Sequence, residues 1–181
     1  MFETSRPFNC NGDEKVDGQA IHFLSFEVNT NQIINVQVEI MDDFPFAVVK
    51  FYDEEFKNAE DPFGIVTGKG NGQIIFRRCL EIMIWFYKQD PRLSFGFAGA
   101  PTFDEIEKPD GKETQRSRIY QGIATRFFAP INFQHLPISG HSTYVLLNRA
   151  YCDPDPALAP MMYKSLQKAY PEASCWHALL G

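Results

Sequence analysis

The sequence has no long hydrophobic run, no paired-cysteine motif and no apolar leader. Its 181 residues include no apolar segment near the roughly 20 residues that a membrane-spanning helix needs. The opening residues, MFETSRPFNCNGDEK, lack the apolar core of a signal peptide. The four cysteines form no C-x-x-C pair and are too sparse for a disulfide framework. We therefore expect a cytoplasmic protein that does not associate with a membrane.

Signatures of known chemistry are also missing. No G-x-G-x-x-G stretch follows a predicted strand, and no G-x-S-x-G turn marks a serine hydrolase. Cys79 lies in a strongly apolar segment and is expected in the core, because a nucleophilic cysteine needs surroundings that stabilise its thiolate. The sequence thus predicts no catalytic residue, no cofactor and no metal ligand.

Positive charge is scarce. The chain has 17 Lys and Arg against 23 Asp and Glu, a net charge of −6 at pH 7. Nucleic-acid binders are usually basic, because they neutralise phosphates, so nucleic acid is an improbable partner. The balance suits a protein partner with a basic surface, or a small-molecule site. Acidic runs at 42–43, 53–55 and 60–61 are expected in solvated loops, or as a negative face if they gather at one end of a sheet.

What the chain does have is apolar and aromatic residues. Hydrophobic residues make up 44%, and 17 Phe, 7 Tyr and 2 Trp favour a large aromatic core. This length supports one well-buried core. We predict a flexible N-terminal arm at 1–18, a single domain at 19–151, and a proline-rich, then helical tail at 152–181.

Periodicity predicts an α+β fold. Apolar alternation indicates strands near 21–28, 34–40, 46–52, 92–98, 133–138 and 143–149. Helical spacing predicts helices from Asn71, as the cap, to about 89 and from about 114 to 128, with a short one opened by Pro160. The order β-β-β-α-β-α-β-β predicts a mostly antiparallel sheet with two main helices on one face and a helical tail.

Two arginines mark a candidate anion site. Arg116 and Arg118 fall in the first turns of the second predicted helix, which begins near Thr114. Arginine is disfavoured at the positive end of a helix dipole unless an anion compensates, and free N–H groups there attract phosphate. Thr114, Arg116 and Arg118 are therefore candidate ligands for an anion. The alternative is a structural ion-pair network with the acidic loop at 104–110.

The same region carries a resemblance. A strand ending in the small-residue turn at 99–101, then a helix opening with Arg116-x-Arg118-x-Tyr120, resembles uncharacterised small α+β families of bacterial and mobile-element genomes. The resemblance covers roughly residues 70–130. These families have no settled activity, so it implies a fold and not a chemistry.

Two histidines bracket a candidate hairpin turn. His135 and His141 could approach one another and act as an acid/base pair, although their spacing matches no metal motif. The alternative is that both are ordinary surface or core histidines.

The tail is rich in residues favoured at interfaces. Met161, Met162, Tyr163, Tyr170 and Trp176 are candidate interface anchors, or parts of a strap that packs on its own domain. Our leading hypothesis is a small protein-binding protein without catalysis, such as a phage or mobile-element inhibitor or accessory of a bacterial defence or toxin system. The alternatives are a phosphate- or nucleotide-handling enzyme or RNA-acting nuclease with an Arg/His cleft, and a structural homodimer built through the tail.

Overall fold

A seven-stranded sheet organises the chain. The computed structural model describes residues 8–16, 19–64, 69–98, 115–138, 143–153, 155 and 157–170. The strands are β1 (Asn9–Val16), β2 (Gln19–Asn29), β3 (Gln32–Met41), β4 (Phe46–Asp53), β5 (Ser94–Ala98), β6 (Phe133–Ile138) and β7 (Thr143–Asn148). The α-helices are α1 (Gly72–Gln89), α3 (Gln115–Phe127), α4 (Arg149–Cys152) and α5 (Leu158–Ala169), and η1 (Glu54–Phe56) and η2 (Pro62–Gly64) are 3₁₀ turns.

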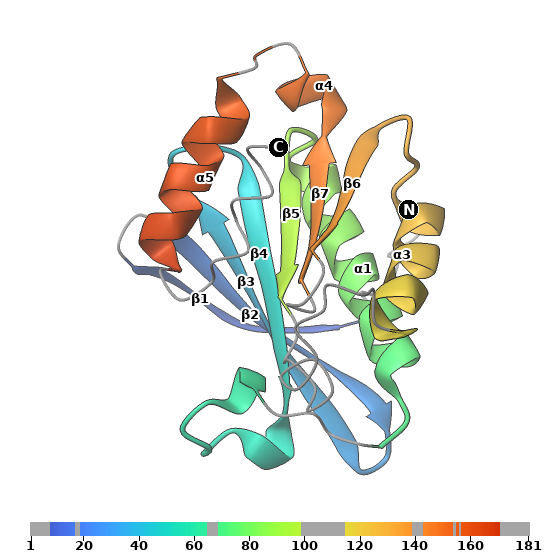
Figure 1. The fold of residues 1–181 in the computed structure, drawn as a ribbon. Coiled ribbons are helices and arrows are strands. Elements are labelled where there is room, and N and C mark those ends of the chain that lie inside the picture. The colour runs from blue at the N-terminus through green and yellow to red at the C-terminus, as the bar shows by residue number, and fades with distance from the viewer. Residues whose placement is uncertain are drawn as a thin grey trace, which may run out of the picture.

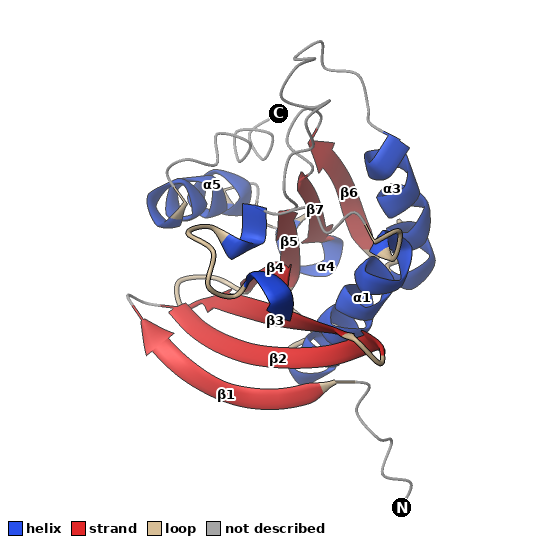
Figure 2. Ribbon diagram, turned by 90° about the horizontal axis from the view of Figure 1, so that it is seen from below, coloured by secondary structure: helices blue, strands red, loops and turns tan. Residues whose placement is uncertain are grey.

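The sheet is mostly antiparallel, as the sequence predicts. Its strand order is β1-β2-β3-β4-β5-β7-β6, and only β4 and β5 are parallel. A parallel neighbour needs a crossover connection, which α1 provides. Figure 2 shows α1 and α3 on one face of the sheet and α5 on the other. The α+β class and the two main helices on one face are confirmed.

The expected flexible arm contains a seventh strand. Residues 9–16 pair antiparallel with β2, and all eight are exposed. Because neither face of this edge strand is covered, its residues need no apolar alternation, and backbone pairing alone defines it. The register shifts between Cys10 and Gly12, where Gly12 has φ 149°, a bulge typical of protected edges.

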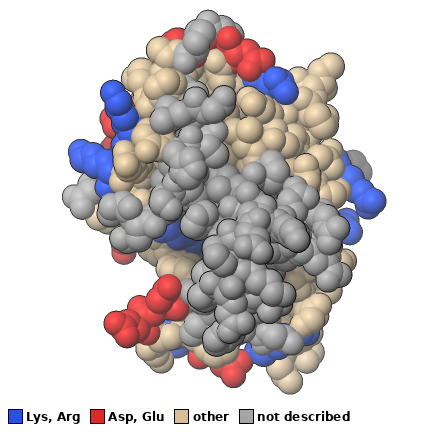
Figure 3. Space-filling view, in the orientation of Figure 1, with Lys and Arg blue, Asp and Glu red and all other residues tan. Residues whose placement is uncertain are grey.

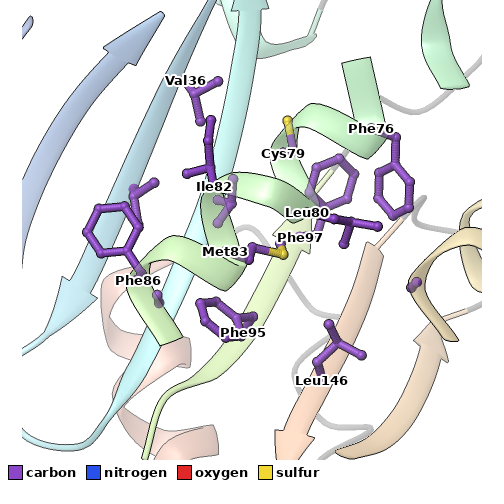
Figure 4. Packing of buried hydrophobic residues seen from close by; sticks show 14 of the residues in the cluster. Val36, Phe76, Cys79, Leu80, Ile82, Met83, Phe86, Phe95, Phe97 and Leu146 are labelled. Carbon is purple, nitrogen blue, oxygen red and sulfur yellow. The ribbon is translucent and has the colours of Figure 1, made fainter. Parts of the chain in front are cut away.

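The larger core lies between α1, α3 and the sheet. The helix α1 buries a stripe of apolar side chains: Ile75, Phe76, Cys79, Leu80, Ile82, Met83 and Phe86. Figure 4 shows these side chains meeting Val36, Phe95, Phe97 and Leu146. The Phe97 ring lies 4.9 Å from that of Phe76 and 5.6 Å from that of Phe51. The core role predicted for Cys79 is confirmed, and burial raises the pKa of its thiol far above the usual range.

A smaller core lies on the opposite face, under α5. Met162 and Leu166 pack there with side chains from β4 and β7, among them Phe46, Val48 and Leu147. The described part of the tail therefore packs on its own domain.

The parallel pair β4–β5 is short. Only Phe46–Val49 pair with Ser94–Phe97, and the last four residues of β4, 50–53, pair with β3 alone among the described residues. Figure 1 shows β4 running on beyond the tip of β5. The strand β5 ends at Ala98, so residues 50–53 of β4 extend beyond it. We call the end of this pairing, with residues 50–53 as its outer arm, the β4–β5 fork.

The acidic runs do not share one end of the sheet. One run, 42–43, follows β3, and another, 53–55, follows β4. Because β3 and β4 are antiparallel, these runs lie at opposite ends of the strand pair. Figure 3 likewise shows acidic side chains at separate places, with basic ones between them. The alternative of one negative face built from all the runs is wrong.

Candidate functional site

A buried polar network joins the β4–β5 fork to the start of α1. Asp53, at the end of β4, accepts hydrogen bonds from Gln32 (2.9 Å) and Lys69 (3.0 Å). Gln32 in turn accepts one from the side chain of Asn71 (2.8 Å). Asp53 and Gln32 are only 3% and 1% exposed. The glycine-rich segment before α1 is thus held on both sides of Gly70 by strands β3 and β4.

The Asp53 carboxylate remains ionised in this network. Burial raises its pKa, but hydrogen bonds from Gln32, from Lys69 and from the Glu55 backbone N–H outweigh that effect and leave the pKa below its ordinary value. The ion pair with Lys69 acts in the same direction. A charged carboxylate therefore fixes Lys69 at the fork.

The start of α1 has no side-chain cap. The sequence predicts Asn71 as a capping residue, but its side chain makes no capping bond and is turned to Gln32 instead. The helical hydrogen bonds begin with the Ile75 N–H, which donates to the Asn71 carbonyl (3.0 Å). The backbone N–H groups of the first turn, at residues 72–74, precede the intrahelical ladder and have no acceptor among the described residues.

Glycine leaves space at this helix start. A Cβ atom placed on Gly70 or Gly72 would meet no described atom within 4 Å. Gly70 has φ +73°, a conformation that favours glycine, whereas no such restriction applies to Gly72. In the sequence, the signal for this helix start is the G-K-G-N-G stretch at 68–72, directly before the predicted helix.

The two faces of the fork carry different chemistry. On the α1 face, the rings of Phe51 and Phe97 stack across the two strands. On the α5 face, Lys50 donates to buried Glu39 (2.7 Å), and Glu39 also accepts from Gln37 (2.6 Å) and from the Tyr170 hydroxyl. The Lys50 ammonium lies 4.6 Å from the centre of the Tyr170 ring. We call these residues the Lys50 cluster. The apolar alternation of the strands predicted at 34–40 and 46–52 gives no sign of it.

The predicted anion site on the second helix lies mostly outside the described residues. The backbone of α3 begins at Gln115, so a helix does carry Arg116 and Arg118 in its first turn. Their side chains, and Thr114 altogether, lie outside what the structure describes. Their role stays a prediction.

Both ring nitrogens of His135 have partners within the domain. Nε2 lies 2.7 Å from the Phe128 carbonyl, and Nδ1 lies 2.8 Å from the Tyr144 hydroxyl. Because a carbonyl only accepts, Nε2 carries the proton and Nδ1 accepts from the tyrosine. Burial lowers the pKa of His135, so the ring is held neutral. His141, its proposed partner, lies outside the described residues.

The predicted interface residues are divided by the packing of α5. Met161 is exposed, Met162 is buried, and Tyr163 and Tyr170 are half-buried against the smaller core. Trp176 lies outside the described residues. Met162 therefore serves the domain's own core, which matches the alternative of a strap.

Other kinds of site find no support in the described part of the chain. No group of three or more His, Cys, Asp or Glu side chains there could hold a metal ion. No described helix has the length and apolar character to cross a membrane. Comparison with protein families, with curated proteins and with solved structures finds no match.

Proposed function

We propose that this protein binds a phosphate-bearing small molecule at the β4–β5 fork. The observation that carries the proposal is the short pairing of β4 with β5, which leaves residues 50–53 of β4 paired with β3 alone among the described residues. In open α/β sheets, ligands bind outside the carboxyl ends of the parallel strands, and the fork lies at the carboxyl ends of β4 and β5. The phosphate-handling hypothesis thus moves from Arg116 and Arg118 to the start of α1.

The start of α1 suits the phosphate itself. Its first-turn N–H groups point out of an 18-residue helix whose N-cap side chain is engaged elsewhere. Such N–H groups, together with the helix dipole, attract anions. Glycines at 70 and 72 would let an anion approach the backbone closely, because no side chain intervenes.

Nearby acidic side chains are already satisfied. Asp53 and Glu55 share Lys69, and Glu54 accepts from Asn35 (2.6 Å) and Lys57 (2.5 Å). Their repulsion of an anion is reduced, since each negative charge has a bonded donor.

The outer arm of β4 suggests what the rest of the ligand is. An extended chain with amide groups can pair with a free strand edge as an added strand does. Coenzyme A joins a diphosphate to an extended amide-bearing arm, so it matches both the helix start and the strand edge. ADP has the diphosphate but no such arm, so it matches the helix start alone. The ligand class that we propose is therefore a group carrier and not a plain nucleotide.

Titration calorimetry on a matched pair of variants tests the proposal. Gly72→Ala adds a methyl group at the helix start, and Gly122→Ala makes the same change within α3, where the Cβ also meets no described atom. With pyrophosphate, ADP and coenzyme A as probes, we expect binding to the unmodified protein, strongest for coenzyme A. Gly72→Ala should weaken it by about tenfold or more, since close backbone approach is blocked. Gly122→Ala should bind normally.

Two results would overturn this function: no binding of any of the three probes, or equal weakening by both variants. The protein-partner and homodimer hypotheses stay predictions. Of their proposed anchors, Met162 is buried in the domain and cannot contact a partner while α5 stays in place.

A further inference from the structure

We propose that α5 is a releasable strap and that Tyr170 is its lock. The helix would leave the sheet as a unit while the α1 face stays folded. This inference does not depend on the ligand proposed above.

The helix α5 itself buries few side chains against the sheet. Of its described side chains, only Met162 and Leu166 are buried, at 1% and 0% exposure. Met161, one residue away, is 54% exposed. Elements that bury few apolar side chains are the ones that open locally at low cost in free energy. Tyr163 and Ala169 add only partly buried contacts to the same core. The apolar contact of α5 is therefore smaller than that of α1, which buries seven side chains.

The lock lies where α5 ends. Tyr170 follows the last helical residue, and its backbone N–H donates to the Leu166 carbonyl (2.8 Å). Its hydroxyl donates to the Glu39 carboxylate, and its ring lies under the Lys50 ammonium. One side chain thus joins the C-terminal end of α5 to both β3 and β4.

These contacts are strong because they are buried and charged. Glu39 is 3% exposed and shares its negative charge among donors from Gln37, Lys50 and Tyr170. A hydrogen bond to a charged group stabilises more than a neutral one, and a cation over an aromatic ring adds to it. Lys50 lies 5.7 Å from the ring of Phe63 as well, so the segment containing η2 meets the same cluster. Releasing Tyr170 would remove several of these contacts at once.

Release would expose a defined surface. The side chains beneath α5 are apolar and come from adjacent strands: Phe46, Val48, Val145 and Leu147. Lys50 is the first residue of β4 beyond its pairing with β5, so the lock lies at the point where the β4–β5 fork begins. The strap therefore covers an apolar face next to the proposed ligand site.

Amide hydrogen exchange followed by mass spectrometry tests the lock. Tyr170→Phe removes the hydroxyl donor and keeps the ring, and Tyr163→Phe makes the same change on the same helix. In Tyr170→Phe we expect amides of α5 to exchange about tenfold faster, because the bond to Glu39 is lost, and amides of α1 to stay better protected than those of α5. Tyr163→Phe should leave α5 close to the unmodified protein.

The exchange of α1 also reports whether the variant remains folded. Equal protection of α1 and α5 amides in the unmodified protein would mean that both open only globally, and the strap would be refuted. If Tyr170→Phe and Tyr163→Phe behave alike, Tyr170 is not the lock. Leu166→Ala offers a second check, since it should speed the exchange of α5 and leave α5 amides less protected than α1 amides; equal protection of the two helices would also refute independent release.

Discussion

The helices α1 and α5 cover opposite faces of the sheet, and they bury very different numbers of side chains against it. The helix α1 buries seven side chains against its face, whereas Met162 and Leu166 are the only buried ones among the described side chains of α5. On the α1 face an aromatic ring of the helix packs edge-on against one of β5, with the ring centres of Phe76 and Phe97 4.9 Å apart. On the α5 face a charged cluster around Lys50 supplements a thin apolar layer. The sheet thus has one firmly packed helix, α1, and one helix, α5, that we propose can be released.

Large-to-small substitutions on each face should show the largest difference. Phe97→Ala leaves a cavity among Phe51 and Phe76, and we expect a loss of about 3–5 kcal/mol in the free energy of unfolding. Leu166→Ala should cost less, about 1–2 kcal/mol, because α5 can detach before the rest unfolds. Urea unfolding followed by circular dichroism measures both. Equal losses would mean that the two faces are equally integral to the fold.

The buried carboxylates sharpen the same comparison. Asp53→Asn removes the ion pair with Lys69 on the α1 side, and we expect a loss of about 1–3 kcal/mol at pH 7. The pKa of Asp53 is lowered by folding, so its contribution is fully present above the unfolded value near about 4 and is lost as pH falls through the folded value. The difference in the free energy of unfolding between the unmodified protein and Asp53→Asn should therefore disappear at acid pH.

Glu39→Gln is the matched change on the α5 face. Its effect should appear mainly as faster amide exchange in α5, with a smaller change in global unfolding than that of Asp53→Asn. A global loss as large as that of Asp53→Asn would show that the Lys50 cluster supports the whole sheet and not only the strap.

The smallest expected effect concerns His135, which joins β6 to the end of α3 through the Phe128 carbonyl. Because folding lowers its pKa, the unfolded chain binds a proton more readily, and stability should fall as pH drops below about 6.5. The loss should be on the order of 1 kcal/mol. Thermal unfolding between pH 5 and about 8 should show this slope in the unmodified protein and a flatter one in His135→Gln. Parallel slopes would assign the pH dependence to another group.

The periodic elements could be predicted because one face of each is apolar. The helix α1 and strands β3 and β4 follow the spacing of their buried side chains closely. The strand β1 could not be, since all of its residues are exposed and only its pairing with β2 defines it. Nor does the sequence indicate that β4 and β5 are parallel, because strand order depends on contacts between distant segments.

The site was harder to predict than the fold. Asn71 is a residue type that favours helix N-caps, yet its side chain donates a hydrogen bond to Gln32, 39 residues earlier. Glu39 alternates with apolar residues and therefore looks solvent-facing, but the tail, 131 residues further on, covers it. Both contacts depend on tertiary structure, which local propensity and periodicity do not encode.

The short pairing of β4 with β5 also affects how the chain folds during synthesis. The four-stranded meander is complete at Asp53, whereas β5 ends at Ala98, 45 residues later. At about 5–20 residues per second, the ribosome needs roughly 2–9 seconds for that stretch. Throughout it, the outer edge of β4 has no neighbour, and the apolar face of the meander waits for α1. The nascent meander is therefore the stage at which two chains made side by side would most readily pair with each other in error.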